Sequence, residues 1–200
     1  AIGAGIPIHE PRGHMVVDIG GGTTDAAVIS LGGIVSSISV KVAGNKIDQA
    51  ISDYIKKQFN LAIGDSTAEH IKIGIGSAIP IEEEFSMTIK GRDFLTGLPR
   101  SIDIRTNEMV KAVDGELRDI IKAIKQVLHN TPPELASDII ENGIVMTGGG
   151  SLLRNFNTLV SRSTGVPATV AKDALYCVAK GTGIALEHLN AWKKSIVAKR

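Results

Sequence analysis

The sequence has little of what marks secreted, membrane-spanning or metal-cluster proteins. Its 200 residues contain one cysteine, Cys177, which excludes an internal disulfide framework and a multi-cysteine zinc site. No run approaches the roughly 18 to 20 consecutive apolar residues that a membrane-spanning helix needs. No basic-then-apolar signal segment opens the chain. We therefore expect a soluble, cytoplasmic protein.

A dominant charge is missing as well. Lys and Arg together number 22 and Asp and Glu 21, which leaves a net charge of +1. Such a balance creates no strong field for a polyanion, so we expect no nucleic-acid partner. Aromatic residues make up only 4% of the chain, whereas glycine accounts for 22 residues. Glycine averages about 7% in proteins, so its positions here carry information.

Apolar periodicity predicts an α/β protein with an α+β insertion. Strands are expected over 14–20, 26–31 and 34–42, with Gly32-Gly33 as a hairpin turn, which together make a three-stranded antiparallel meander. A helix beginning at Asn45 follows and extends to Phe59. The later expected elements are a helix over 66–77, strands over 84–94 and 100–106, a long helix from Asn107 that ends before Thr131-Pro132-Pro133, a strand over 143–146, a helix over 151–164, a strand over 168–171 and a helix over 174–192.

The change of character after residue 61 predicts two structural units. One is discontinuous and comprises 11–61 plus 137–200, and the smaller is an insertion over 62–136. Residues 193–200 are expected to be a frayed basic end. The chain opens with Ala1 and not with methionine, so we expect residues 1–10 to link this region to a preceding part of a longer chain.

Two glycine triplets each follow an apolar strand directly. Glycine lets a phosphate or sugar approach the backbone closely, and successive N–H groups can turn toward an anion. The first triplet, Gly20-Gly21-Gly22, is combined with the carboxylate of Asp18 and the hydroxyls of Thr23 and Thr24. A carboxylate beside phosphates needs a cation between them, so this set predicts Mg²⁺. A tight hairpin turn without a ligand is the alternative.

The second triplet, Gly148-Gly149-Gly150, precedes the helix expected from Ser151. The positive end of that helix would then point at the loop. Both triplets lie at strand ends of the same discontinuous unit, which predicts two walls of one nucleotide cleft. Neither a Gly-Lys dipeptide nor a Gly-x-Gly-x-x-Gly spacing occurs at the glycine clusters, so the two common phosphate loops are excluded.

These segments resemble a known superfamily. Residues 18–25, Asp-Ile-Gly-Gly-Gly-Thr-Thr-Asp, resemble the second phosphate motif of the actin, heat-shock chaperone and sugar kinase ATPases, and residues 144–153 resemble their adenosine motif. Residues 42–48, 67–73, 75–78 and 178–183 are similar to segments of the MreB family of bacterial actins, in the same order. The resemblance implies an actin-like ATPase half with an RNase H-like β-β-β-α-β-α domain. It also implies a missing N-terminal half that carries the first phosphate hairpin and a water-positioning glutamate.

The resemblance assigns a role to each matching residue. Asp18 would approach Mg²⁺ through water, Gly20 to Thr24 would face the terminal phosphates of ATP, and Thr23 or Thr24 would orient the attacking water. The stretch Gly148, Gly149, Gly150 and Ser151 would lie on the ribose and α-phosphate side. Glu69 and Lys72 would flank adenine and ribose. Glu69 could instead complete a capping box with Ser66, and Lys72 could be a solvated charge.

The same resemblance implies a cytoskeletal function. Family members bind Mg-ATP, hydrolyse it slowly and polymerise head to tail into filaments that govern rod cell shape, at the inner face of the membrane. This half alone is expected to make no direct membrane contact and to be inactive as an ATPase. A membrane-bound morphogenesis partner is a further expectation. Alternatives are a small-molecule kinase or chaperone-type ATPase, since fold does not fix function, and a docking module without catalysis.

Overall fold

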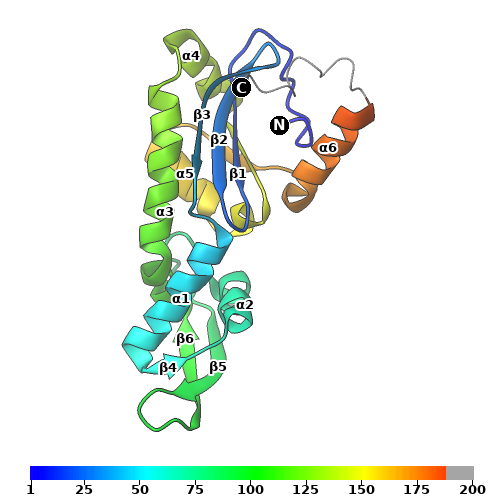
Figure 1. The fold of residues 1–200 in the computed structure, drawn as a ribbon. Helices are drawn as coiled ribbons and strands as arrows, with labels where there is room; N and C mark the ends of the chain where they lie inside the picture. The colour runs from blue at the N-terminus through cyan, green and yellow to red at the C-terminus, as the bar shows by residue number, and fades with distance from the viewer. Residues whose placement is uncertain (188–200) are drawn as a thin grey trace.

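The computed structural model describes residues 1–187 and arranges them around two β-sheets (Figure 1). The larger sheet has the strand order β3-β2-β1-β7-β8. Its strands are β1 (His14–Ile19), β2 (Thr24–Ser30), β3 (Gly33–Val40), β7 (Ile144–Thr147) and β8 (Ala168–Val170). The first three strands are antiparallel neighbours, whereas β7 and β8 run parallel to β1. The predicted meander and the α/β class are confirmed.

The hairpin between β2 and β3 turns one residue earlier than expected. Ser30 pairs with Gly33, so the turn residues are Leu31 and Gly32 and not Gly32-Gly33. Both have positive φ, 50° and 72°, which is the conformation that a two-residue hairpin of matching twist requires. The dipeptide Gly32-Gly33 therefore marks the turn correctly but is displaced by one position.

A smaller antiparallel sheet of order β4-β5-β6 lies at the opposite end of the molecule (Figure 1). It consists of β4 (Leu61–Ala62), β5 (Ser86–Asp93) and β6 (Pro99–Arg105). The helices α1 (Gly44–Phe59) and α2 (Asp65–Ile75) pack against each other between the two sheets. Helix α1 begins one residue before Asn45, and its N-cap is Ala43. Strand β4, two residues long, was not predicted because it is too short to show a period.

The long helix α3 (Thr106–His129) lies beside both sheets (Figure 1). Its buried stripe packs against β2, β3 and α1, and its start contacts β6. The predicted end before Pro132-Pro133 is confirmed. These prolines also begin a helix that the sequence analysis did not foresee, α4 (Pro133–Asn142). Pro133 occupies its first position, where the missing N–H costs nothing.

The segment after β7 differs most from expectation. The single helix predicted over 151–164 is wrong, since a short 3-10 helix, η1 (Gly149–Leu152), is followed by a break and then by α5 (Phe156–Thr164). The helix predicted over 174–192 begins as a second 3-10 turn, η2 (Ala174–Tyr176), and continues as α6 (Cys177–Glu187). Residues 188–200, with the end of that helix and the predicted frayed tail, lie outside the described residues.

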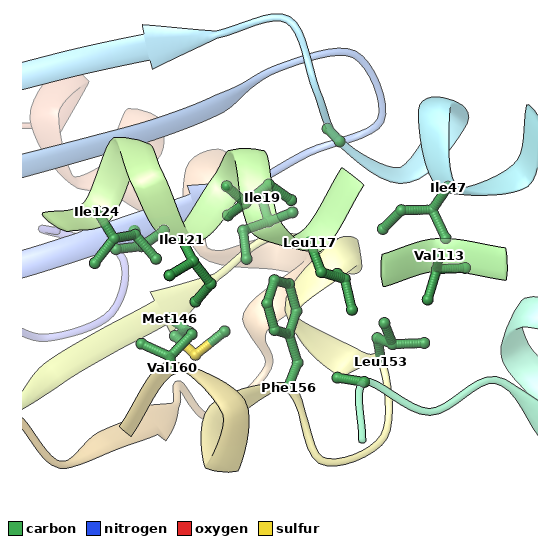
Figure 2. Close-up of a cluster of buried hydrophobic side chains, with 14 of the residues drawn as sticks. Ile19, Ile47, Val113, Leu117, Ile121, Ile124, Met146, Leu153, Phe156 and Val160 are labelled. Carbon is green, nitrogen blue, oxygen red and sulfur yellow. The ribbon is translucent and has the colours of Figure 1, made fainter. Parts of the chain in front are cut away.

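A continuous apolar core connects the larger sheet to α3 and α5. Figure 2 shows the ring of Phe156, which is fully buried, among Leu117, Met146 and Leu153. Helix α6 lies on the other side of the sheet from α3, next to the N-terminal residues (Figure 1). Within residues 1–187 no helix combines the length and the apolar character needed to cross a bilayer. The division into 11–61 plus 137–200 and 62–136 stays a prediction.

Candidate functional site

Asp18 lies near the end of β1, where polar side chains of three neighbouring strands lie side by side. It pairs across the sheet with Asp25 of β2 and with Thr147 of β7. The Thr147 hydroxyl, which is buried, donates a 2.7 Å hydrogen bond to Asp18 Oδ1. Asp18 Oδ2 accepts no hydrogen bond from the described residues. One oxygen of the half-buried carboxylate is thus oriented by the protein and the other is left for a ligand.

The first glycine loop is fixed to the start of α1. The N–H of Gly20 donates to the carbonyl of Thr23 at 3.0 Å and closes the turn. The N–H groups of Gly44 and Asn45 donate to the carbonyls of Gly20 and Gly21 at 3.0 and 2.8 Å. The first N–H groups of α1 are therefore satisfied by the loop itself. This anchoring gives the loop a defined position beside the helix.

Thr23 and Thr24 have different surroundings although they are adjacent. Thr23 is exposed, and its hydroxyl donates to Asp25 Oδ2 at 3.1 Å. Thr24 is fully buried, and its hydroxyl donates to the carbonyl of Val42 at 2.7 Å. The hydroxyl available at the surface of the loop is that of Thr23.

The glycines of the two loops have different physical reasons to be glycine. A Cβ at Gly148 would stand 2.3 Å from the carbonyl oxygen of Ile19, and one at Gly150 would stand 2.4 Å from Ile19 Cγ2. Gly148 also has a φ of +81°. By contrast, nothing lies within 4 Å of the corresponding position at Gly22. Packing explains Gly148 and Gly150 of the second triplet, whereas Gly22 leaves open space that a ligand could enter.

The second loop lies directly against the end of β1, as the two-wall interpretation requires. Its polar groups are used internally: the N–H of Gly148 donates to the carbonyl of Ala174, and the Ser151 hydroxyl donates to the carbonyl of Gly148 at 2.7 Å. Gly149 remains half-exposed. The expectation that a helix starting at Ser151 points its positive end at this loop is wrong, because α5 begins at Phe156 after a left-handed Asn155.

A hollow of about 480 Å³ opens between the starts of α1 and α2. Such a volume is within the usual range of small-molecule sites. Gly21 adjoins it, since a Cβ there would stand 3.2 Å from Asn45 Oδ1. The hollow therefore continues from the first glycine loop. Its lining residues are Asn45, Asp48, Gln49, Asp65, Ser66 and Glu69.

Of the two α2 residues assigned by the resemblance, Glu69 lines this hollow, and Lys72 contacts Asp48, another of the lining residues. The alternative that Glu69 completes a capping box is wrong: α2 starts at Asp65, and no described side chain caps it. Glu69 is exposed and lines the hollow. The alternative that Lys72 is a solvated charge is also wrong, because its Nζ lies 2.9 Å from Asp48 Oδ2 and the side chain is 16% exposed.

The α1 side of the hollow is not among the predicted site residues. Asn45 lies in the first turn of α1, which is bonded to the first glycine loop, and Asp48 and Gln49 lie one turn further along. Only the packing of α1 against α2 makes these residues part of a site. A helical projection places Asn45, Asp48 and Gln49 on one face of α1, at spacings of three and four. That signal was available, but which element faces them was not.

A divalent cation would need ligands beyond those the described chain gathers. Within residues 1–187 no cluster of three His, Cys, Asp or Glu side chains could hold a metal. Mg²⁺ is commonly held by one or two carboxylates, several waters and the phosphates of a substrate. Asp18, with one oxygen oriented by Thr147 and the other without a partner, fits such a minimal protein contribution.

The chain is similar to known proteins in both sequence and fold. The family model for MreB/Mbl protein matches residues 1–194. The cell shape-determining protein MreB of Escherichia coli K12 is 49% identical over 190 residues, which are 95% of this chain and 55% of that protein. MreB5 of Spiroplasma citri bound to AMPPNP superposes with a TM-score of 0.92 at 44% identity, covering 97% of this chain and 58% of that one. The chain thus spans little more than half the length of these relatives.

A more distant structure shares the fold with this chain but has low sequence identity. The MamK double helical filament structure matches with a TM-score of 0.76 at 23% identity, over 93% of this chain and 57% of that one. The predicted actin-like fold is confirmed by these structures.

Proposed function

Because the chain belongs to the MreB/Mbl family of actin-like, cell shape-determining proteins, we propose that it forms one wall of a cleft that binds Mg-ATP. The observation that carries this proposal is the continuity of the site. The glycine loop beside Asp18 adjoins, through Asn45, the hollow lined by Glu69. MreB5 of Spiroplasma citri was crystallised with AMPPNP and with ADP, which supports a nucleotide as the ligand.

Different residues of this wall would contact different parts of the nucleotide. The loop from Gly20 to Gly22, exposed at Gly21 and Gly22, receives the terminal phosphates, and the Thr23 hydroxyl orients phosphate or the attacking water. Thr24 contributes by holding the loop to Val42. Glu69 and Lys72 face ribose and base from α2, while the loop from Gly148 to Ser151 supports the α-phosphate side. When bound, Mg²⁺ supplies neutralisation of the phosphate charge, and Asp18 holds it directly or through water.

The whole protein would use this cleft to control self-association. Head-to-tail contacts between identical copies generate open filaments. The filament structures of MamK, which shares the fold, support the same behaviour here. We propose a cytoplasmic filament at the inner face of the membrane, with slow ATP hydrolysis loosening its contacts and a membrane-bound morphogenesis partner. The predicted units 11–61 plus 137–200 and 62–136 would both belong to this one wall, and the nucleotide would lie between this half and the other half of the protein.

Asp18→Ala in the full-length protein tests the site. The substitution removes the carboxylate that faces the metal, so ADP binding should lose its dependence on Mg²⁺ while circular dichroism stays unchanged. Isothermal titration with ADP, with Mg²⁺ and with EDTA, measures this. Asp119→Ala removes an exposed carboxylate on α3 as a matched control. Unaltered Mg²⁺ dependence in a folded Asp18→Ala protein would exclude the metal role.

Sedimentation of the full-length protein tests the filament. The proposal expects pelleting with Mg-ATP above a critical concentration and little pelleting with Asp18→Ala. ATP turnover that rises steeply with an added small-molecule acceptor, without pelleting, would instead support a kinase.

A further inference from the structure

We infer that Asp48 is a positioning residue for the nucleotide: its carboxylate holds the Lys72 ammonium at the junction between the hollow and the glycine loop. The inference rests on the proposed function, because Lys72 is taken to face the nucleotide. It adds a residue that neither the sequence motifs nor the resemblance assign.

The Asp48–Lys72 pair differs from the other ion pairs of the described chain. The Lys72 Nζ to Asp48 Oδ2 distance is 2.9 Å, and both side chains are 16% exposed. Each other ion pair within residues 1–187 has at least one partner that is 44% exposed or more. Exposed pairs contribute little because solvent screens them, whereas a half-buried pair fixes the geometry of both side chains. This pair also joins two helices, α1 and α2.

Stability alone does not account for this pair. Asp48 Oδ1 is buried and has no hydrogen-bond partner. An unpartnered buried oxygen on a carboxylate is costly, and apolar side chains of similar size would fill such a position at no such cost. Because Oδ1 is shielded from solvent, a ligand in the hollow cannot reach it without moving the side chain. The carboxylate therefore acts through the group it does contact, which is Lys72.

The Lys72 ammonium lies beside the start of α1, where the first glycine loop is attached. Lys72 Nζ lies 3.6 Å from where a Cβ at Gly44 would stand. Gly44 is the residue whose N–H binds the carbonyl of Gly20 in the first glycine loop. A cation at the start of α1 is opposed by the helix dipole. Asp48, one turn further along α1, supplies the negative charge that keeps it there.

Loss of the carboxylate should release Lys72 toward solvent. The net charge around the hollow would stay the same, because one negative and one positive charge are lost together, but the cation held beside the first glycine loop would be gone. We therefore expect weaker nucleotide binding from a residue that does not touch the nucleotide.

A double-mutant cycle in the full-length protein tests this. The variants are Asp48→Asn, Lys72→Met and the two combined, with ADP affinity measured by isothermal titration and folding by circular dichroism. Asp53→Asn is the matched control, since Asp53 is an exposed carboxylate on the same helix bonded only to Gln49. We expect about a tenfold loss of affinity for Asp48→Asn, none for Asp53→Asn, and no further loss when Asp48→Asn is added to Lys72→Met.

The outcomes separate this inference from the proposed function. Equal losses from Asp48→Asn in the presence and absence of Lys72 would overturn it, because Asp48 would then act independently of Lys72. Unchanged affinity in Asp48→Asn would overturn it while leaving ADP binding intact. No ADP binding by the unaltered protein would contradict both. If Asp48→Asn fails to fold, the combined variant can be used instead, because it has no unpaired charge. An ADP affinity equal to that of Lys72→Met would support the inference, and a lower affinity would overturn it.

Discussion

At the scale of single residues, Thr23 in the loop and Thr24 at the start of β2 show how one step along the chain separates an exposed hydroxyl from a buried one. Thr23 belongs to the exposed loop, whereas Thr24 is the first residue of β2 and its side chain faces the interior. Thr23 is exposed beside the glycine loop, whereas Thr24 is fully buried against the carbonyl of Val42. The two residues should respond in opposite ways to the same substitution.

Valine at each position separates binding from stability. Thr24→Val removes a buried donor and leaves the Val42 carbonyl without its partner, which should lower the free energy of unfolding by about 1 to 3 kcal/mol. Thr23→Val should change it by less than about 0.5 kcal/mol and slow ATP turnover of the full-length protein instead. Urea unfolding and a phosphate-release assay measure the two effects. A loss of stability in Thr23→Val together with slower ATP turnover in a stable Thr24→Val protein would contradict this assignment.

Asp93 closes the loop between β5 and β6, and its surroundings lower the pKa of its carboxyl group. The N–H groups of Thr96 and Leu95 donate to its carboxylate, each at 2.9 Å, and so does the Arg100 guanidinium. The Thr96 N–H, the Arg100 guanidinium and the Leu95 N–H, in decreasing order of effect, lower the pKa of Asp93 from 3.8 to about 2. All of these donors favour the ionised form.

The lowered pKa of Asp93 predicts a pH dependence of stability. The stabilisation is complete above the unfolded pKa of 3.8 and is lost as the pH falls from there through about 2. Asp93→Asn should therefore be less stable than the unaltered protein at pH 6, and the difference should shrink below pH 3.8. Urea unfolding of both proteins at several pH values measures it. A difference that is constant down to pH 2 would contradict the assignment.

Residue types at the site were predictable, but their pairings were not. Asp18, the first glycine triplet and Glu69 carry recognisable local signals, and the structure brings them to one region. The hydrogen bond from Thr147 to Asp18 joins residues 129 positions apart, and the Asp48–Lys72 pair joins two helices. A single sequence gives no register between such segments, so the partners that orient Asp18 and Lys72 appear only in the fold.

At the scale of elements, regular periods were predictable and boundaries between short elements were not. The meander and α3 have sustained apolar periods and were found. The break after η1 was missed because Leu152 and Leu153 continue an apolar pattern, while Asn155 adopts a left-handed conformation that ends it. Helix α4 was missed because Pro132-Pro133 was interpreted only as a stop. Proline at a first helical position is equally a start.

Phe156 anchors α5 to the sheet and to α3, so its removal should loosen that whole layer. The side chain is fully buried among Leu117, Met146 and Leu153 (Figure 2). Phe156→Ala should lower the free energy of unfolding by about 3 to 5 kcal/mol, through lost burial and the cavity left behind. Ile140→Ala on α4, where the side chain is 60% exposed, should cost much less. Equal losses in urea unfolding would show that the cluster does not depend on Phe156.

At the scale of the whole molecule, the first glycine loop is held to α1 on one side and is exposed on the other. Gly21, Gly22 and Thr23 are exposed, so within residues 1–187 the phosphate side of the proposed cleft has one wall. The MreB of Escherichia coli matches this chain over only 55% of its own length. The remaining part of such a protein would have to supply the opposite wall and complete the environment of the phosphates.

A comparison of residues 1–200 with the full-length protein tests this view. Positioned groups accelerate a reaction only when they surround the reacting atoms, so one wall should not catalyse. Residues 1–200 alone should bind ADP at least about tenfold more weakly and release phosphate from ATP no faster than the Asp18→Ala full-length protein. Circular dichroism must first show that the shorter chain is folded. Turnover at the full-length rate would place the active site entirely within these residues and contradict the proposed shared cleft.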